Sequence, residues 1–207
     1  MTTDVGGPGG GGPDAGGPDV GGADAGGADV GGADVEATDS AELPVAGVAG
    51  AELGGTGPTA RLTELGLTLP SVVPPVAAYV PAVRTGNYVY TSGQLPMIAG
   101  QLAQTGKVGA EVTPEEAKNL ARVCGLNALA AAASVAGGLD AVRRVVKVVG
   151  FVASSPGFTG QPQVVNGASE LFGEVFGEAG VHARSAVGVA VLPLDAPVEI
   201  EIVVEVA

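Results

Sequence analysis

Two charged residues near the carboxyl end of the chain, Arg184 and Glu199, have the types needed to bind a carboxylate and to orient a water molecule beside it. A guanidinium group binds a carboxylate through two parallel N–H donors, and a neighbouring carboxylate can orient or activate a water molecule. The simpler alternative is an exposed Arg–Glu ion pair on a solvated sheet face, which contributes little to stability or function.

The two segments that carry these residues, 183–191 and 198–206, alternate in polarity and therefore predict β-strands with one apolar face each. A proline-bounded turn over 193–197 suggests that the two strands pair as antiparallel neighbours. If their apolar faces align, Arg184 and Glu199 share the opposite face, above a floor of small residues that includes Ala186.

A second candidate site lies where the aromatic, β-branched segment 88–94 ends in Ser92, Gly93 and Gln94. A glycine between two polar residues at a strand end lets a ligand approach the backbone N–H groups closely. The alternative is an ordinary bend from strand to loop.

The elements that must position these residues follow from local signals. Thr113, Pro114 and Glu116 form a capping-box pattern that predicts a helix to about residue 135, and Cys124 falls within its apolar stripe. Segment 140–152 predicts a strand that is covered on both faces, and 163–179 predicts a second helix. Segment 61–73 is expected to be a short first strand or an edge segment.

The order of these elements predicts a two-layer α+β domain, with a mixed sheet and two helices on one face. The second face of such a sheet is uncovered in a single chain. Small residues and alternating charges on that face suggest that it is buried against identical subunits.

Residues 1–57 differ from the rest of the chain, and we expect them to be a disordered acidic tail. Residues 11–35 repeat a five-residue unit of the type GGADV, and the tail contains no Lys or Arg. Residues 58–207 are then expected to form one domain. The net charge of −13 argues against nucleic acid or an anionic membrane as a partner.

The single cysteine and single histidine limit the other chemistries. Cys124 alone allows neither an intrachain disulfide nor a cysteine-cluster metal site, which favours a reducing cytoplasm. His182 alone predicts no zinc site and is interpreted as a loop histidine near a strand start. We also expect no secretory leader and no membrane-spanning helix.

From about residue 74 to the end, the chain resembles the Rid family (YjgF/RidA, reactive intermediate deaminases). The resemblance rests on YVPAVRTGNYVYTSGQLP at 79–96, on VVKVVGFVAS at 145–154 with VVNGASELF at 164–172, and on ARSAVGVAVLPLDAPVEIE at 183–201. The segment GFVASSPGFTGQP at 150–162 is similar to a longer-looped branch of that family.

This resemblance implies a chorismate-mutase-like fold with a six-stranded mixed sheet, and a homotrimer built around a barrel of sheets with three clefts between subunits. It implies hydrolysis of reactive 2-imino or enamine acids to 2-oxo acids and ammonia, without a metal or cofactor. Arg184 would bind the substrate carboxylate and Glu199 would position the attacking water. The remaining pocket residues implied by the resemblance are Tyr79, Ser92, Gly93, Asn166 and Ala186.

Two positions depart from the pattern of the best-known family members, which have a cysteine at the position of Ala186 and often an acid at that of Gly188. These changes leave the side chain of the substrate open. Two other function classes also stay open: a binding protein that holds a carboxylate metabolite without turnover, and a nuclease or chaperone-like protein.

Overall fold

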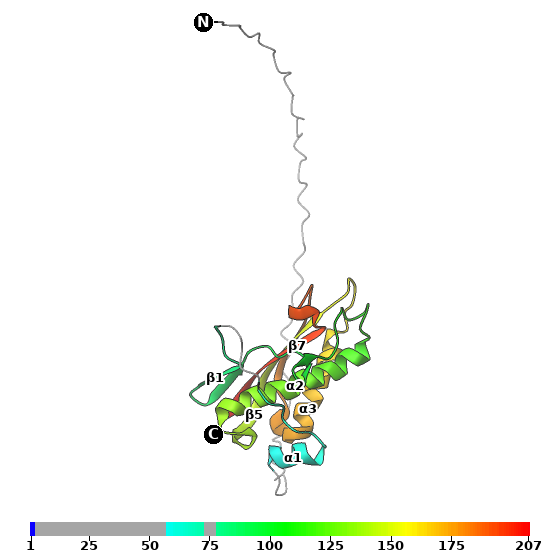
Figure 1. Cartoon of the computed structure of the whole chain (residues 1–207). Helices are drawn as coiled ribbons and strands as arrows, with labels where there is room; N and C mark the ends of the chain where they lie inside the picture. The colour runs from blue at the N-terminus through cyan, green and yellow to red at the C-terminus, as the bar shows by residue number, and fades with distance from the viewer. Residues whose placement is uncertain (3–56, 73–77) are drawn as a thin grey trace, which may run out of the picture. The chain divides into compact units, whose positions relative to one another are not determined.

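The computed structural model describes residues 1–2, 57–72 and 78–207 (Figure 1). The predicted tail falls almost entirely on residues 3–56 and so lies outside the described residues. Residues 57–72 and 78–207 belong to one compact unit.

The two predicted helices pack side by side against one face of the sheet (Figure 1). Helix α2 spans Pro114–Ala136 and begins with the predicted capping box, in which Glu116 N–H donates to Thr113 Oγ1 at 3.2 Å and Thr113 N–H donates to Glu116 Oε2 at 2.8 Å. Helix α3 spans Gln161–Phe176 and continues as the 3-10 helix η2, Gly177–Gly180. The two helices can pack closely because Gly167 has no side chain: a Cβ atom there would collide with the Lys118 carbonyl oxygen.

Helix α2 is long and apolar enough to span a membrane by length and composition alone. However, its apolar side chains, including Leu120, Cys124 and Leu129, are buried in the core of the domain. This is the arrangement of a central helix in a folded α+β domain.

The main sheet has five strands in the order β1-β2-β7-β5-β6. These strands are β1 (Ala82–Thr85), β2 (Tyr88–Thr91), β5 (Val142–Ala153), β6 (Ala183–Val189) and β7 (Val198–Val206). Strands β5 and β6 are parallel, and the other neighbouring pairs are antiparallel. A separate hairpin pairs β3 (Met97–Ile98) with β4 (Gln101–Leu102).

The order of the strands contradicts the predicted hairpin of the last two strands. Strand β5 lies between β6 and β7 and pairs with both, so the two strands that carry Arg184 and Glu199 are not neighbours. The turn residues at 193–197 form the 3-10 helix η3 (Pro193–Asp195) within a connection that crosses over β5 instead of a tight turn.

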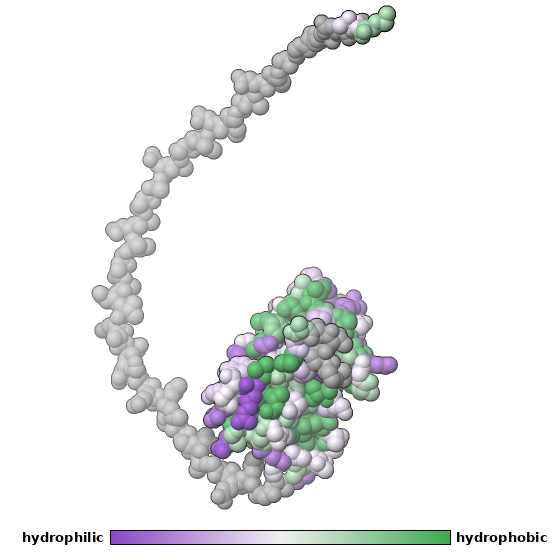
Figure 2. All heavy atoms as spheres, turned by 60° about the vertical axis from the view of Figure 1, so that its left-hand side comes forward, coloured by the Kyte–Doolittle hydropathy of each residue, from purple (hydrophilic) through white to green (hydrophobic). Residues whose placement is uncertain are grey.

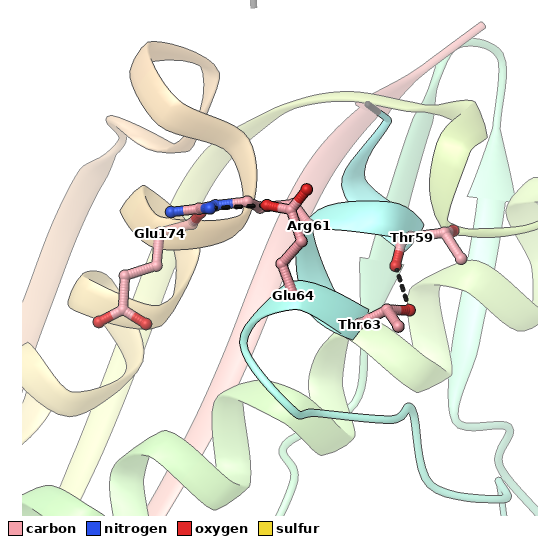
Figure 3. A network of polar contacts seen from close by, with 5 residues as sticks. All are labelled: Thr59, Arg61, Thr63, Glu64 and Glu174. Carbon is pink, nitrogen blue, oxygen red and sulfur yellow. Dashed lines mark hydrogen bonds and ion pairs between the residues drawn. The ribbon is translucent and has the colours of Figure 1, made fainter. Parts of the chain in front are cut away.

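The predicted six-stranded sheet is also wrong for the described residues, because residues 61–72, the described part of segment 61–73, contain no strand. Residues Pro58–Glu64 form a third helix, α1, with proline in its first turn and Leu62 buried against the core. Arg61 ties α1 to α3, because its Nε donates to the Glu174 carbonyl at 3.0 Å, and its Nη1 pairs with Glu64 at 2.8 Å (Figure 3). Within α1, the Thr63 hydroxyl donates to the Thr59 carbonyl at 3.1 Å (Figure 3).

The two faces of the sheet have different environments. The helix-covered face buries alternate residues of β5 and β7, among them Val148, Val152, Ile200 and Ile202. The residues between them point to the other face, which no element among the described residues covers.

On this open face four large apolar side chains are 42 to 53% exposed: Val83, Tyr88, Tyr90 and Val187. Hydrophobic and hydrophilic residues are interspersed on the side of the domain shown in Figure 2. The prediction that the valines of β6 lie on the same face as the apolar residues of β7 is therefore wrong, since Val187 lies on the open face.

Candidate functional site

Arg184 lies on the helix-covered side of strand β6, at the edge of the sheet. It pairs with Val148 of β5, which is fully buried under the helices. Its Nη1 atom donates to Asn166 Oδ1 at 2.7 Å and to Ser169 Oγ at 3.1 Å, both on α3. Arg184 is half-buried, and its Nε and Nη2 atoms make no hydrogen bond to the described residues, so these donors remain available for a ligand.

The Ser169 hydroxyl also contacts His182, two residues before Arg184. The distance from Ser169 Oγ to His182 Nε2 is 3.0 Å, and the distance from His182 Nδ1 to the Gly180 carbonyl oxygen is 2.6 Å. Burial lowers the pKa of His182, the bond to Gly180 raises it, and the charge of Arg184 lowers it, with a net lowering. Arg184 and His182 line a cavity of about 310 Å³ together with Ser169, Gly173, Gly180 and Val181.

Glu199 and Gly93 form a second cluster, at the end of strand β2. The carboxylate of Glu199 lies so close to Gly93 that a Cβ atom at position 93 would come within 1.8 Å of Glu199 Oε1. Glu199 is half-buried, and burial followed by the charge of Glu201 raises its pKa. The site therefore brings a partly desolvated carboxyl group against a half-buried stretch of backbone.

The backbone at Ser92 and Gly93 bulges out of the sheet. Tyr90 pairs with Val203, and Gln94 pairs with Ile200. The segment from Tyr90 to Gln94 is therefore one residue longer than the segment of β7 that it faces. Such a bulge redirects a strand and its side chains, and bulges occur often beside active sites. The Ser92 hydroxyl donates to the Val80 carbonyl at 2.7 Å, which ties down the segment that carries the exposed Tyr79.

The two clusters point to opposite faces of the sheet in a single chain. Val148 pairs with Arg184, whereas Phe151, three residues further along β5, pairs with Glu199. An odd separation along a regular strand reverses the face. The prediction that Arg184 and Glu199 share one face is therefore wrong, because it assumed that their two strands were neighbours.

The structure thus brings the predicted site residues together in two groups. One group joins Arg184 to Asn166, with Ala186 two residues along the same face of β6. The other joins Glu199 to Gly93, with Ser92 next to it and the segment of Tyr79 held through Val80.

The segment after β5, up to the first residue of α3, fills the space above Gly188. The Gln161 side chain donates through Nε2 to Ser154 Oγ at 3.1 Å and to the Phe158 carbonyl at 2.7 Å. A Cβ atom on Gly188 would lie 2.7 Å from Gln161 Nε2. The longer loop of this chain therefore places an amide where the resemblance leads us to expect an acid.

Cys124 is a core residue, as predicted. It is fully buried on α2, and its thiol donates to the Val198 carbonyl at 3.6 Å. Burial, followed by the charge of Glu199, raises the pKa of this thiol well above its usual value. Within 57–72 and 78–207, no three His, Cys, Asp or Glu side chains come together in a group that could hold a metal ion.

Sequence reasoning missed Ser169 and His182 as neighbours of Arg184. Ser169 follows Asn166 by three residues, so both lie on one face of α3. His182 precedes Arg184 by two residues and so projects to the same side of the chain. These two spacings are the signal that could have identified both residues.

The chain is similar over most of its length to proteins of one family. The family described as "YjgF/chorismate_mutase-like, putative endoribonuclease" matches residues 59–206. Protein TCP17 of Trypanosoma cruzi is 46% identical over 147 residues, which is 70% of this chain and 92% of that protein.

Two crystal structures are similar in both sequence and fold. A protein of unknown function from Agrobacterium tumefaciens is 49% identical with a TM-score of 0.67, and the match covers 72% of this chain and 92% of that one. An endoribonuclease-named protein from Shewanella oneidensis is 32% identical with a TM-score of 0.70, and the match covers 73% of this chain and all of that one.

Proposed function

This chain belongs to the YjgF/RidA family, and on that basis we propose that it hydrolyses reactive 2-imino or enamine acids to 2-oxo acids and ammonia. The observation that carries the proposal is the half-buried Arg184, which is fixed through one nitrogen by Asn166 and Ser169 while its other donors remain available. A guanidinium held in this way suits a carboxylate-bearing substrate.

The reaction requires orientation and a placed water more than a strong nucleophile, because an imine carbon is already electrophilic. Water adds to the C=N carbon, and its proton passes to the nitrogen. Collapse of the resulting carbinolamine forms the C=O bond and releases ammonia. Arg184 would hold the substrate carboxylate throughout these steps.

Glu199 has the properties that the proton transfers need. Its carboxyl group is half-buried and lies against Gly93, and its pKa is raised by burial. A general base works best when its pKa lies near the working pH, so a raised pKa favours this role. Glu199 would take a proton from the attacking water and return it to the leaving nitrogen.

A complete site on this proposal needs two copies of the chain. Arg184 and Glu199 lie on opposite faces of one sheet, so the Arg184 group of one copy would meet the Glu199 group of the next. The half-exposed tyrosines and valines of the open face support such an assembly, because apolar patches of this kind mark interfaces. We propose that the assembly is a homotrimer with its clefts between copies.

The variant Arg184→Ala tests the role of Arg184 directly. Loss of a charge-assisted pair removes ~2 kcal/mol of binding, and kcat/KM should fall about 30-fold or more. An amino-acid oxidase can supply 2-iminopropanoate while ammonia and pyruvate are measured. Arg143→Ala is the matched control, since it removes the same charge from an exposed position of β5.

Two outcomes would contradict the proposal. If Arg184→Ala hydrolysed 2-iminopropanoate as fast as Arg143→Ala, Arg184 would not be the substrate anchor. If the parent protein bound pyruvate but did not accelerate hydrolysis, the alternative of a carboxylate-binding protein would replace the enzyme.

A nuclease function has less physical support. The family description contains the word endoribonuclease, but the net charge of −13 opposes the binding of a polyanionic backbone. RNA cleavage by the pure protein that disappeared in Arg184→Ala would reverse this view.

A further inference from the structure

Arg184 is the first member of a line of hydrogen bonds that crosses from β6 to α3 and back. Its Nη1 atom donates to Ser169 Oγ at 3.1 Å, Ser169 Oγ lies 3.0 Å from His182 Nε2, and His182 Nδ1 lies 2.6 Å from the Gly180 carbonyl. The proposed reaction gives His182 no role, and it uses Ser169 only as a contact of Arg184, so the joint arrangement of the two residues needs a separate explanation.

The direction of every bond in this line is fixed by one carbonyl group. The Gly180 oxygen can only accept, so His182 Nδ1 carries the proton and donates to it. In the neutral ring Nε2 is then an acceptor, and the Ser169 hydroxyl must donate to it. This leaves the lone pairs of Ser169 Oγ for the N–H group of Arg184.

The surroundings of His182 favour the neutral ring that this arrangement requires. Arg184 on β6 is the nearest cation, and α3 presents Ser169 and the edge-on ring of Phe172, with ring centroids 5.8 Å apart. A second cavity beside His182, of about 390 Å³, is also lined by Arg144 of β5, Tyr88 of β2 and Glu205 of β7. The charge of Arg184 and the burial of the ring both disfavour its charged form.

We infer that Ser169 and His182 are positioning residues, which hold Arg184 Nη1 against α3 so that the remaining guanidinium donors face a substrate carboxylate. The inference deepens the proposed function. The identity of the ligand, a small 2-oxo or 2-imino carboxylate, rests on that proposed function. The hydrogen-bond line itself depends only on the contacts among these three side chains and Gly180.

Loss of the Ser169 hydroxyl should weaken ligand binding and leave the chemical step intact. In Ser169→Ala, we expect the Kd for pyruvate, measured by calorimetry, and the KM for 2-iminopropanoate both to rise about 3- to 10-fold, with kcat within about twofold of the parent. Ser169→Thr keeps the hydroxyl and should restore parental binding, because the adjacent cavity of about 310 Å³ has room for the added methyl group.

The control variant is Ser134→Ala, which removes a helix hydroxyl that donates only to the Ala131 carbonyl of its own helix, at 2.7 Å. Equal pyruvate affinity in Ser169→Ala and Ser134→Ala would overturn the inference even if the parent hydrolysed imines. Failure of the parent to bind pyruvate would overturn it as well. A parent that binds pyruvate without turnover would instead refute the deaminase proposal while the positioning role remained intact.

The protonation pattern can be measured without any ligand. His182 is the only histidine of the chain, so its imidazole gives a single set of nitrogen signals in NMR spectra. We expect the Nδ1–H tautomer in the parent and also in Ser169→Ala, because the Gly180 carbonyl that fixes the proton on Nδ1 is unchanged in the variant. A parent ring that is protonated at Nε2 in its neutral form would contradict the direction of the hydrogen-bond line and overturn the inference.

Discussion

The carboxylate of Glu199 lies against Gly93 in the candidate site, and this explains why glycine is needed at that position. The carboxylate fills the volume that a side chain at position 93 would occupy. The main chain at Gly93 does not have a positive φ, so the requirement comes from space and not from backbone conformation. A half-buried carboxyl group is thereby held against backbone that a substrate can approach.

Gly93→Ala should therefore impair catalysis without unfolding the protein. The added methyl group displaces the flexible carboxyl end of Glu199, and a misplaced catalytic group lowers kcat about 10- to 100-fold. Steady-state hydrolysis of 2-iminopropanoate measures the loss, and thermal unfolding followed by circular dichroism serves as the control. Parental kcat with the new methyl group in place would show that the position of Glu199 does not matter.

At the level of single residues, the types were predictable but their partners were not. Arg184, Glu199 and Gly93 stand out because their chemistry is unusual within apolar or β-rich segments. The contact between Arg184 and Ser169 depends on how α3 lies over β6, which no local pattern encodes. The contact between Gly93 and Glu199 depends on a bulge, which adds one residue to a strand and changes its register.

Among the elements, α1 is the one whose type was predicted wrongly, since a short strand or edge segment was expected where the structure has a helix. Its residues 58–64 lie in a short segment with mixed polarity, where strand and helix patterns are hard to separate. In the structure it covers one end of the core through Leu62 and is held to α3 by Arg61 (Figure 3). It therefore has a structural role at the end of the domain where α3 terminates.

Leu62→Ala should destabilise the domain. Removal of a buried leucine side chain costs about 2 to 5 kcal/mol, and we expect the lower end because a short helix at the rim can relax into the gap. Urea unfolding measures the change, with Leu194→Ala as control, because Leu194 is exposed. If both variants had the same free energy of unfolding, α1 would not contribute to the stability of the core.

Helix ends were predictable, but strand order was not. The capping box at Thr113 is a local signal and is present as expected, and α2 ends at Ala136, close to the predicted end at about residue 135. Strand β6 could lie beside β7 or be separated from it by β5, as it is in this sheet. Which of the two forms depends on how the complete connection between the strands packs against the sheet. A parallel pair such as β5 and β6 needs an intervening connection, here α3, and the strand–helix–strand order 142–189 was the available sign of it.

For the whole molecule, the open face of the sheet is the feature that most requires a partner. It carries Tyr88, Tyr90 and Val187 with about half of each side chain exposed. It also carries Glu199, so the surface that needs covering and the proposed catalytic acid lie on the same face. This arrangement links assembly to activity.

Tyr90→Glu should weaken self-association and activity together. A charge in the middle of an apolar contact is costly to desolvate, so light scattering should report a mass that moves from about three times 19.9 kDa towards the single chain. Val135→Asp, on the exposed side of α2, is the control and should leave the assembly intact. If Tyr90→Glu kept the parental mass, the open face would not be the interface.

The most direct test of the central claim is a mixing experiment with two impaired variants, Arg184→Ala and Glu199→Gln. If each site takes Arg184 from one copy and Glu199 from the next, random reassembly of an equal mixture yields an intact pair in about a quarter of the clefts. We therefore expect hydrolysis of 2-iminopropanoate to recover to about a quarter of the parental rate after the two variants are dissociated and reassembled together. A mixture no more active than the two variants alone would contradict a site shared between copies.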